Sequence, residues 1–493
     1  MSASQPPRED DGARRRWFSH QPNVPGVGIV RSYSPRFWGV VVAIGVVSGI
    51  GASLMVALLR LVERLAYGHR APTLLAAARA APGWRHLAAL LLAALIIVVG
   101  LRVLGRLPVS GGTEVSEALW LRSGRLDFVA SIARGVLSIV TVGMGVSLGR
   151  EAAPQLIGAA TASRLAEWAQ FPVWQRRLLV ACGAGAGFAA VYNVPLGGAL
   201  LALEVLLGTL ALSLVLPALL ASLIATAVAW IYLGTGPLYK IATYAFHPSQ
   251  LVFAAVLGPV LGLAAVGWVR LVGLASRLRP KANGRYLAPF GVFGALALIS
   301  IPYPQLLGNG RDIVQLAIVG RISLGLLVIL FLLKPLVTAA CLASGSPGGL
   351  FTPSFAIGSL LAGIGGWVFA HLWSGAAAGS YALIGGGAFL AAAMQGPLSA
   401  TVLVLELTRH FDALMVPTLL AVVEATVVAR VLGAKSIYSA RLGYGSEPEP
   451  DEEVSPPAGA EAIAAVRALD ETLPPDVTGV PRPEPVRPPP REH

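Results

Sequence analysis

Long apolar stretches separated by short polar breaks run through most of the chain. Several stretches reach about 18 residues or more, the length that an α-helix needs to cross a bilayer. The pattern predicts helices at about residues 37–61, 87–104, 128–146, 154–170, 174–191, 195–207, 210–233, 251–275, 289–301, 322–342, 354–373, 381–394, 397–410 and 414–432. Many are shorter than a full span, and several begin at proline, which the first helical turn tolerates. The sequence therefore predicts an all-α protein that crosses a membrane many times.

The second half of the chain repeats the pattern of the first half. Residues 183–204 align with residues 385–406 without a gap. The matching positions include Pro195 with Pro397 and Glu204 with Glu406, and the polar breaks correspond at nearly the same offset through Gly149 with Gly348 and Pro154 with Pro353. Interrupted helices at equivalent positions of two halves are typical of repeat-built transporters, whose site lies near the membrane midplane. We expect two inverted-topology repeats, at about 37–245 and 246–445.

The polar break at residues 146–154 places Arg150 and Glu151 side by side between long apolar runs. Charged residues at that depth are costly and usually functional. Gly149 interrupts the helix, and the helix that restarts leaves unpaired backbone N–H groups, which attract anions. This stretch predicts an anion site inside the membrane, for which Glu151 competes with the anion. The alternative is a loop end at the water interface, where the two charges are paired and solvated.

Composition supports a membrane protein and gives no support for an enzyme. The chain is 55% hydrophobic and 13% charged, with a mean hydropathy of +0.71, whereas soluble domains carry roughly twice that charge. Its 56 glycines allow close helix packing. Cys182 and Cys341 lie in apolar segments and suit neither a disulfide nor a zinc site. No nucleophile–base pair, metal cluster or phosphate loop is evident, so we expect no cofactor.

The charge is unevenly distributed along the chain. Residues 1–36 are polar and basic and show no cleavable signal, which places the N-terminus in the cytoplasm by the positive-inside rule. Residues 446–493 are rich in Pro and Glu and carry a net charge of −7, which predicts a disordered cytoplasmic tail. The remainder carries +19, which favours anionic lipid headgroups and draws anions to the mouths of a pathway. We discount nucleic-acid binding because the basic residues are scattered and do not cluster with aromatics.

Four separated stretches resemble motifs of the CLC family of chloride channels and chloride/proton antiporters, in that family's order. They are residues 149–151 (its G-R-E-G-P), 109–114 (its G-S-G-I-P-E), 345–353 (its G-x-F-x-P with the preceding glycines) and 437–439 (its late tyrosine motif). The resemblance covers roughly residues 35–445 and is to the bacterial type without cytoplasmic CBS domains. It implies a homodimer of subunits built from two inverted halves of broken, tilted helices, with one chloride pathway in each subunit.

The resemblance also implies roles for individual residues. The implied chloride-binding residues are Ser110 and Gly111, Gly349, Leu350 and Phe351, Tyr438, and, at an outer site, Arg150 and Ala152. Glu151 would be the external gate, occupying an anion position when charged and leaving it when protonated. Physical chemistry agrees, because a dehydrated chloride is best held by several partial charges, and protonation removes the claim of a carboxylate on the same position.

The chain departs from the family motifs at several positions. Val109, Gly112 and Thr113 replace residues of the first motif, and Pro154 comes one residue late in the second. Since the anion-facing groups remain, we expect shifted local geometry and an intact site. By the resemblance, Ser110 together with Tyr438 implies chloride and argues against the fluoride-exporting branch of the family and against nitrate, for which the family tends to carry proline in place of serine. Glu204 and Glu406 are expected to have structural, hydrogen-bonded roles, and His371 and His410 to lie at helix ends.

Val205 is the most informative departure. Antiporters of the family often carry an internal proton-relay glutamate there, whereas many of its channels carry valine, and an aliphatic side chain cannot carry a proton. This favours a channel-like or weakly proton-coupled chloride pathway. The alternative is a chloride/proton antiporter with a different internal proton route, for which Glu114 is a candidate. An organic-anion carrier, or a scaffold or sensor without flux, is less favoured. The Ala-, Gly- and Arg-rich composition indicates a GC-rich bacterium and its inner membrane.

Overall fold

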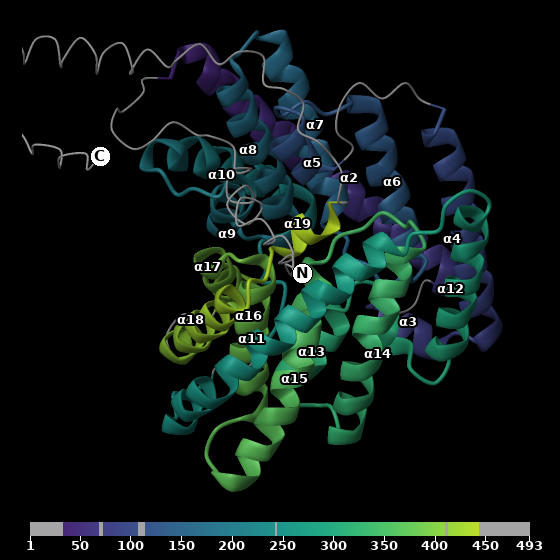
Figure 1. The fold of residues 1–493 in the computed structure, drawn as a ribbon, viewed down its shortest axis with the longest axis vertical. Helices are drawn as coiled ribbons and strands as arrows, with labels where there is room; N and C mark the ends of the chain where they lie inside the picture. Colours follow the sequence, from purple (N-terminus) through teal and green to yellow (C-terminus); the bar gives the residue numbers. More distant parts are fainter. Residues whose placement is uncertain (1–32, 69–71, 107–113, 242–243, 410–412, 443–493) are drawn as a thin grey trace, which may run out of the picture. The chain divides into compact units, whose positions relative to one another are not determined.

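The computed structural model describes residues 33–68, 72–106, 114–241, 244–409 and 413–442, and the structural statements below concern these residues (Figure 1). The chain divides into two compact units, Met1–Glu449 and Pro450–His493, of which the second is entirely outside the described residues. Three sequence predictions also lie outside the described residues: Ser110 with Gly111, His410 and the acidic tail. Of the basic N-terminal segment, only residues 33–36 are described.

The described part of the chain is helical and contains no strand. Its elements are α2 (Pro35–Tyr67), α3 (Leu74–Ala80), α4 (Gly83–Leu104), α5 (Val115–Leu121), α6 (Phe128–Gly143), α7 (Ala152–Trp168), α8 (Val173–Tyr192), α9 (Pro195–Leu200) continuing into the π-helical turn η2 (Leu201–Leu207), α10 (Leu212–Leu233), α11 (Pro248–Arg277), α12 (Gly284–Ser300), η3 (Pro304–Leu306), α13 (Arg311–Val319), α14 (Leu324–Ala343), α15 (Phe351–Leu372), α16 (Ala378–Met394), α17 (Pro397–Thr408), α18 (Met415–Val431) and α19 (Ile437–Arg441). The all-α prediction is confirmed.

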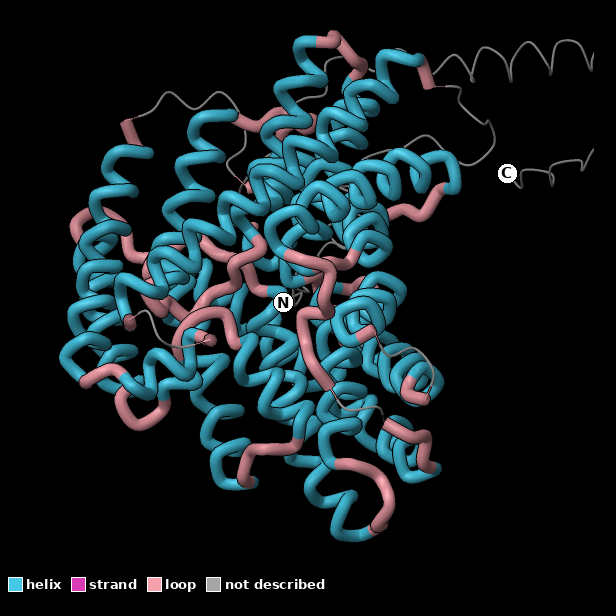
Figure 2. Tube along the Cα trace, turned by 180° about the vertical axis from the view of Figure 1, so that it is seen from behind, coloured by secondary structure: helices cyan, strands magenta, loops and turns pink. Residues whose placement is uncertain are grey.

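Six helices are long and apolar enough to cross a membrane. They are α2, α4, α10, α11, α14 and α15, and the shorter apolar helices include α6, α12, α16 and α17. Figure 2 shows that several connecting loops lie in the middle of the molecule as well as at its ends. Short helices that stop at interior loops are the broken helices that the sequence predicted.

Four short helices lie in stretches where the sequence predicted no helix. They are α3, α5, α13 and α19, and the Ser436 side chain caps the start of α19. All four have nine residues or fewer, so they lack the long apolar run by which the spans were recognised.

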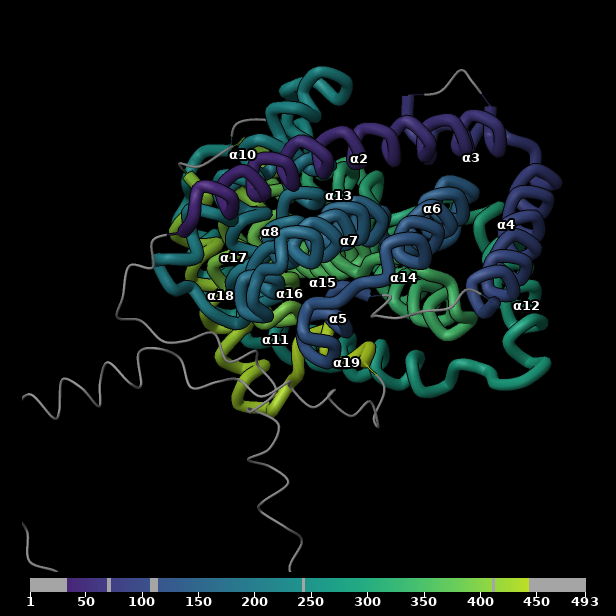
Figure 3. Tube along the Cα trace, turned by 90° about the horizontal axis from the view of Figure 1, so that it is seen from above, coloured from purple at the N-terminus to yellow at the C-terminus, as the bar shows by residue number. Residues whose placement is uncertain are grey.

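Two helix pairs, α7 with α8 and α15 with α16, pack closely at equivalent places in the two halves (Figure 3). In the first pair, a Cβ at Gly158 would collide with the carbonyl of Gly183. In the second, a Cβ at Gly358 would collide with Phe389. Glycine at these contacts lets the helix backbones approach, which explains much of the high glycine content.

The two sides of the helical unit can be assigned from contacts made by α2. Near its start, the Phe37 ring lies 5.8 Å from Phe171, just after α7, and the Tyr33 hydroxyl donates to the carbonyl of Ser213 at the start of α10 over 3.1 Å. At its end, the Tyr67 hydroxyl donates to the carbonyl of Met144, just after α6, over 2.9 Å. We call the first side the N-terminal side and the second the opposite side.

Candidate functional site

The two polar breaks meet in the interior. The Gly149 N–H donates to the Gly349 carbonyl over 2.7 Å, and the Gly349 N–H donates to the Gly149 carbonyl over 2.8 Å. This antiparallel bridge brings together the loops that start α7 and α15, one from each half. Because the first N–H groups of a helix have no partner within it, the bridge gathers backbone donors from both halves at one place.

The Glu151 carboxylate occupies this place. The side chain is buried, Oε1 accepts a hydrogen bond from the Phe351 N–H over 2.7 Å, and Oε2 accepts one from the Tyr192 hydroxyl over 3.0 Å. A Cβ at either Gly149 or Gly349 would overlap the carboxylate, so only glycine leaves room for it. The donors and the two glycines form a site for an anionic group, and the anionic group present is a side chain of the protein.

Tyr192 contributes to this site and was given no role from the sequence. It ends α8, is fully buried, and its hydroxyl lies 2.7 Å from Thr352 Oγ1 as well as 3.0 Å from the carboxylate. A buried tyrosine hydroxyl usually needs a hydrogen-bond partner. The signal in the sequence was therefore a tyrosine at the end of the apolar run 178–191, but its partners Glu151 and Thr352 lie far from it along the chain.

Arg150 does not pair with its neighbour. Its side chain is only 9% exposed, its guanidinium lies 5.3 Å from the centre of the Tyr192 ring, and its Nε has no hydrogen-bond partner. Among the described residues, no ion pair joins Arg150 to Glu151. The alternative in which the two charges are paired and solvated at an interface is therefore wrong, because both are buried and each faces different groups.

The remaining predicted chloride-binding residues fall into three groups. Leu350, Phe351 and Ala152 lie at the starts of α15 and α7, beside the bridge. Tyr438 lies in α19, and among the described residues its hydroxyl contacts Met394 Sδ over 3.9 Å. Ser110 and Gly111 lie outside the described residues.

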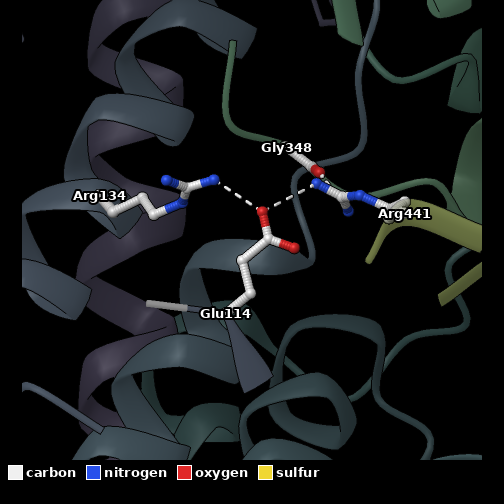
Figure 4. A network of polar contacts seen from close by, with 4 residues as sticks. All are labelled: Glu114, Arg134, Gly348 and Arg441. Atoms are coloured by element: carbon white, nitrogen blue, oxygen red, sulfur yellow. Dashed lines mark hydrogen bonds and ion pairs between the residues drawn. The ribbon is translucent and has the colours of Figure 1, made fainter. Parts of the chain in front are cut away.

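An ion-pair cluster joins α19 to the second break (Figure 4). Glu114 Oε1 lies 2.6 Å from Arg134 Nη2 and 3.4 Å from Arg441 Nη2, and Arg441 Nη1 donates to the Gly348 carbonyl over 3.1 Å. Burial alone would raise the pKa of Glu114, but Arg441 and Arg134, with Arg279, lower it to about 2. Glu114 therefore remains charged at ordinary pH.

Glu204 and Glu406 have matching structural roles in the two halves. Glu204 accepts hydrogen bonds from the N–H groups of Leu398 (3.2 Å) and Ser399 (2.6 Å) at the start of α17. Glu406 accepts them from Leu196 (3.1 Å) and Gly197 (2.6 Å) at the start of α9. Each half thus caps a helix of the other half, as expected for an inverted repeat.

Val205 lies next to Glu204 and faces an apolar contact. Its side chain is buried, and a Cβ at Gly396 would overlap it. This residue offers no titratable or hydrogen-bonding group to a proton path.

Lys334 is a second residue that the sequence analysis missed. It lies in α14, is fully buried, and donates to Ser147 Oγ (2.8 Å), the Gly308 carbonyl (2.9 Å) and the Leu306 carbonyl (3.3 Å). Ser147 is two residues before Gly149, so this lysine ties the helix that precedes the second break to the loop that forms the first. Three acceptors satisfy its ammonium group, which is how a charge is tolerated at this depth.

A cavity of about 490 Å³ opens on the opposite side, where α2 and α8 end. Its charged lining residues are Arg60, Glu63, Arg64, Arg150, Arg311 and Asp312. Arg150 and Tyr192 connect this cavity to the Glu151 site. The described residues contain no group of His, Cys, Asp and Glu that could hold a metal ion, and Cys182 and Cys341 are buried free thiols.

Residues 93–430, more than half of the chain, match the model of the family described as voltage gated chloride channel. The chain belongs to the CLC family of chloride channels and transporters. It is 32% identical over 385 residues to a protein of Ralstonia nicotianae named putative chloride channel protein ClcB-like, with 75% of this chain and 88% of the relative covered. It is 29% identical over 380 residues to the H(+)/Cl(-) exchange transporter ClcA of Citrobacter koseri, with 72% and 78% covered.

Solved structures of the family share the fold. A slow cyanobacterial Cl−/H+ antiporter superposes with a TM-score of 0.72 at 22% identity, covering 83% of this chain and 97% of the antiporter. A CLC-type fluoride/proton antiporter superposes with a TM-score of 0.67 at 19% identity, covering 82% and 97%. These likenesses confirm the predicted architecture of inverted, broken-helix repeats. The chain is thus a membrane protein of a family that transports chloride.

Proposed function

We propose that the chain moves chloride through a pathway that the Glu151 carboxylate closes. The observation that carries this proposal is the position of that carboxylate. It lies between two glycines and accepts hydrogen bonds from the Phe351 N–H and the Tyr192 hydroxyl. Chloride needs the same partial positive charges and the same room. The side chain and the ion therefore compete for one position.

Protonation decides the competition. A neutral Glu151 loses its charge-assisted hydrogen bond to the Phe351 N–H and swings away, and chloride takes its place. The Leu350 and Phe351 N–H groups, with Gly349 between them and the first break, bind the ion there, while the Tyr438 hydroxyl contacts it from the side of α19. Ser110 and Gly111 complete the inner part, and Arg150 with Ala152 forms an outer site.

We propose a channel-like or weakly proton-coupled pathway. Val205 and the ionised Glu114 support this, because neither offers a proton relay on the N-terminal side of Glu151. The exchange activities named for the Citrobacter relative and for the cyanobacterial antiporter support the alternative at least as strongly, a chloride/proton antiporter with another internal route. Water-filled space could carry protons without a titratable side chain.

The deciding experiment is chloride efflux from liposomes that contain the purified protein, with external pH recorded throughout. We expect chloride flux with little or no linked proton movement. Proton uptake against its gradient, driven by chloride and abolished in Glu151→Gln, would instead establish the antiporter. The matched control is Glu167→Gln, which removes an exposed carboxylate of the same helix, α7. Absence of chloride flux from protein that folds normally would contradict both.

The setting of this pathway is part of the proposal. The basic residues 1–36 support an N-terminal side that faces the cytoplasm of a bacterium, so the 490 Å³ cavity faces outward and both termini lie on the cytoplasmic side of the inner membrane. We also propose a homodimer with one pathway in each subunit. Chemical crosslinking in native membranes tests the dimer, and labelling of single cysteines introduced at Gly68 and Lys281 tests the orientation.

A further inference from the structure

The cavity on the opposite side is far larger than one chloride ion requires. It has a volume of about 490 Å³, whereas a water molecule, which is close to chloride in size, takes up about 30 Å³ of liquid. Its lining comes from the end of α2, the end of α8 and the loops at residues 233–238 and 307–312. The space therefore fits a larger solute above the Glu151 site.

The charges of the lining favour an anion. Four arginines and two carboxylates leave a formal surplus of two positive charges. One carboxylate is partly used, because Asp312 Oδ2 accepts the Leu75 N–H over 2.9 Å. Burial and the nearby charge of Arg150 lower the pKa of Arg311, so two like charges face the same space. An anion placed there would relieve their repulsion.

Unused hydrogen-bond donors point into the same region. Arg150 is nine-tenths buried, and its Nε has no partner. Arg311 uses Nη2 for the Leu238 carbonyl over 3.2 Å, and its other guanidinium N–H groups have no partner among the described residues. A buried donor without a partner is costly, and guanidinium groups match the geometry of oxyanions with two N–H groups at once.

We propose that this cavity binds a small divalent oxyanion of the sulfate type, held by Arg150 and Arg311 and attracted by Arg60 and Arg64. Two negative charges match the surplus of the lining, and several oxygens match the spare N–H groups. A single chloride has one negative charge and no oxygens, and the phosphodiester of a lipid headgroup carries only one negative charge. The bound oxyanion lies over Arg150 and Tyr192, and so it obstructs entry of chloride from this side.

Binding is tested on the purified full-length protein by calorimetric titration with sulfate in a chloride-free gluconate buffer. We expect one site in the wild type and about tenfold weaker binding in Arg311→Gln, the loss of one charge-assisted contact. Glu63→Gln should bind several-fold more tightly, since it removes a negative charge from the lining. The matched control Arg321→Gln, just beyond the other end of α13, should bind as the wild type does.

A second variant tests the same proposal in case Arg311→Gln does not fold. Arg60 is exposed and lies over the Tyr232 ring at 5.9 Å, a weak surface contact, so Arg60→Gln should fold and bind sulfate a few-fold more weakly. No sulfate binding by folded wild-type protein would overturn the proposal. Equal weakening in Arg321→Gln and Arg311→Gln would also overturn it, because the effect would then be general electrostatics.

The obstruction, unlike the binding, rests on the proposed chloride transport. External sulfate should slow chloride efflux from liposomes, and its half-inhibiting concentration should shift among the variants in the same order as the dissociation constant. Chloride flux that sulfate binding leaves unchanged would contradict the obstruction. If no chloride flux exists in any sample, the proposed function fails, while the titration still decides whether the cavity binds the oxyanion.

Discussion

The two polar breaks have the same architecture and opposite chemistry. Each follows a helix of its half, joins the bridge between Gly149 and Gly349, and leads into a helix whose third residue is proline. After Gly149 come Arg150 and Glu151, whereas Leu350 and Phe351 follow Gly349. The first break thus supplies a carboxylate acceptor, and the second supplies backbone donors with apolar side chains.

Under the proposed function, this difference lets a symmetric scaffold produce a one-sided gate. The donors of the second break are peptide N–H groups, which are permanent. The acceptor of the first break is a carboxylate, whose charge a proton removes. Only the first break can therefore change state, and the second provides a fixed surface for whichever anion is present.

Removing the charge of the first break should have the largest effect. In Glu151→Gln we expect chloride flux at neutral pH to rise roughly 10- to 100-fold, because the competitor loses charge-assisted hydrogen bonds worth about 1.5–3 kcal/mol. The flux should also lose its dependence on external pH. Liposome efflux at several pH values measures both, with Glu167→Gln as the control. A variant that keeps the wild-type pH profile would show that another group is the gate.

Adding a methyl group at Gly349 should weaken chloride binding between the two breaks. In Gly349→Ala, built in the Glu151→Gln background, we expect chloride binding to weaken at least about tenfold, since a methyl group takes the room of the anion. Calorimetric titration with chloride provides the measurement. Gly291→Ala is the control, because a Cβ there meets nothing within 4 Å. Equal affinities in the two variants would place the anion elsewhere.

Cutting the link between the breaks should destabilise the fold. Lys334→Met removes three hydrogen bonds and leaves the Leu306 and Gly308 carbonyls without this donor, at a cost of about 2–4 kcal/mol. Thermal unfolding in detergent tests this, against the exposed Lys281→Met as control. If both variants unfold at the wild-type temperature, the lysine is not a structural tie.

A finer change at the gate is Tyr192→Phe. The carboxylate loses a donor that favours its charged form, so the midpoint of the pH dependence of flux should move to higher pH. A hydrogen bond worth about 0.5–1.5 kcal/mol corresponds to a shift of about one pH unit or less. Thr352→Val, which removes only the second partner of this hydroxyl, should shift the midpoint less. A midpoint that moves to lower pH would contradict the assigned role.

The smallest effect concerns the tie between the second break and α19. Glu114→Gln should leave proton movement unchanged, because a carboxyl with a pKa of about 2 stays charged at ordinary pH. Since the neighbouring arginines lower this pKa below its value in the unfolded chain, the stabilisation from Glu114 is complete at ordinary pH and is lost as pH falls toward 2. The difference in unfolding temperature between wild type and variant should therefore be constant from pH 8 to 5 and shrink in acid. Proton transport that disappears in this variant would revive Glu114 as a relay.

The sequence predicted the membrane spans and the repeat because both depend on local patterns along the chain. Apolar runs of 18 residues or more located the spans, and the gapless match of residues 183–204 to 385–406 located the repeat. It failed at α3, α5, α13 and α19, where a few residues form a helix only because neighbouring elements stabilise it. It also overlooked Tyr192 and Lys334, whose partners are distant in the chain.

The sequence by itself determined the helical membrane class, the inverted repeat, the family and the candidate carboxylate Glu151. Each follows from residue type and spacing along one stretch of chain. Only the tertiary structure decided that Phe351 and Tyr192 hold that carboxylate, that no ion pair among the described residues joins Arg150 to it, and that arginines surround Glu114. Hydrogen bonds and charges act through space over a few ångströms, so groups as far as 327 residues apart become partners only after the halves have packed.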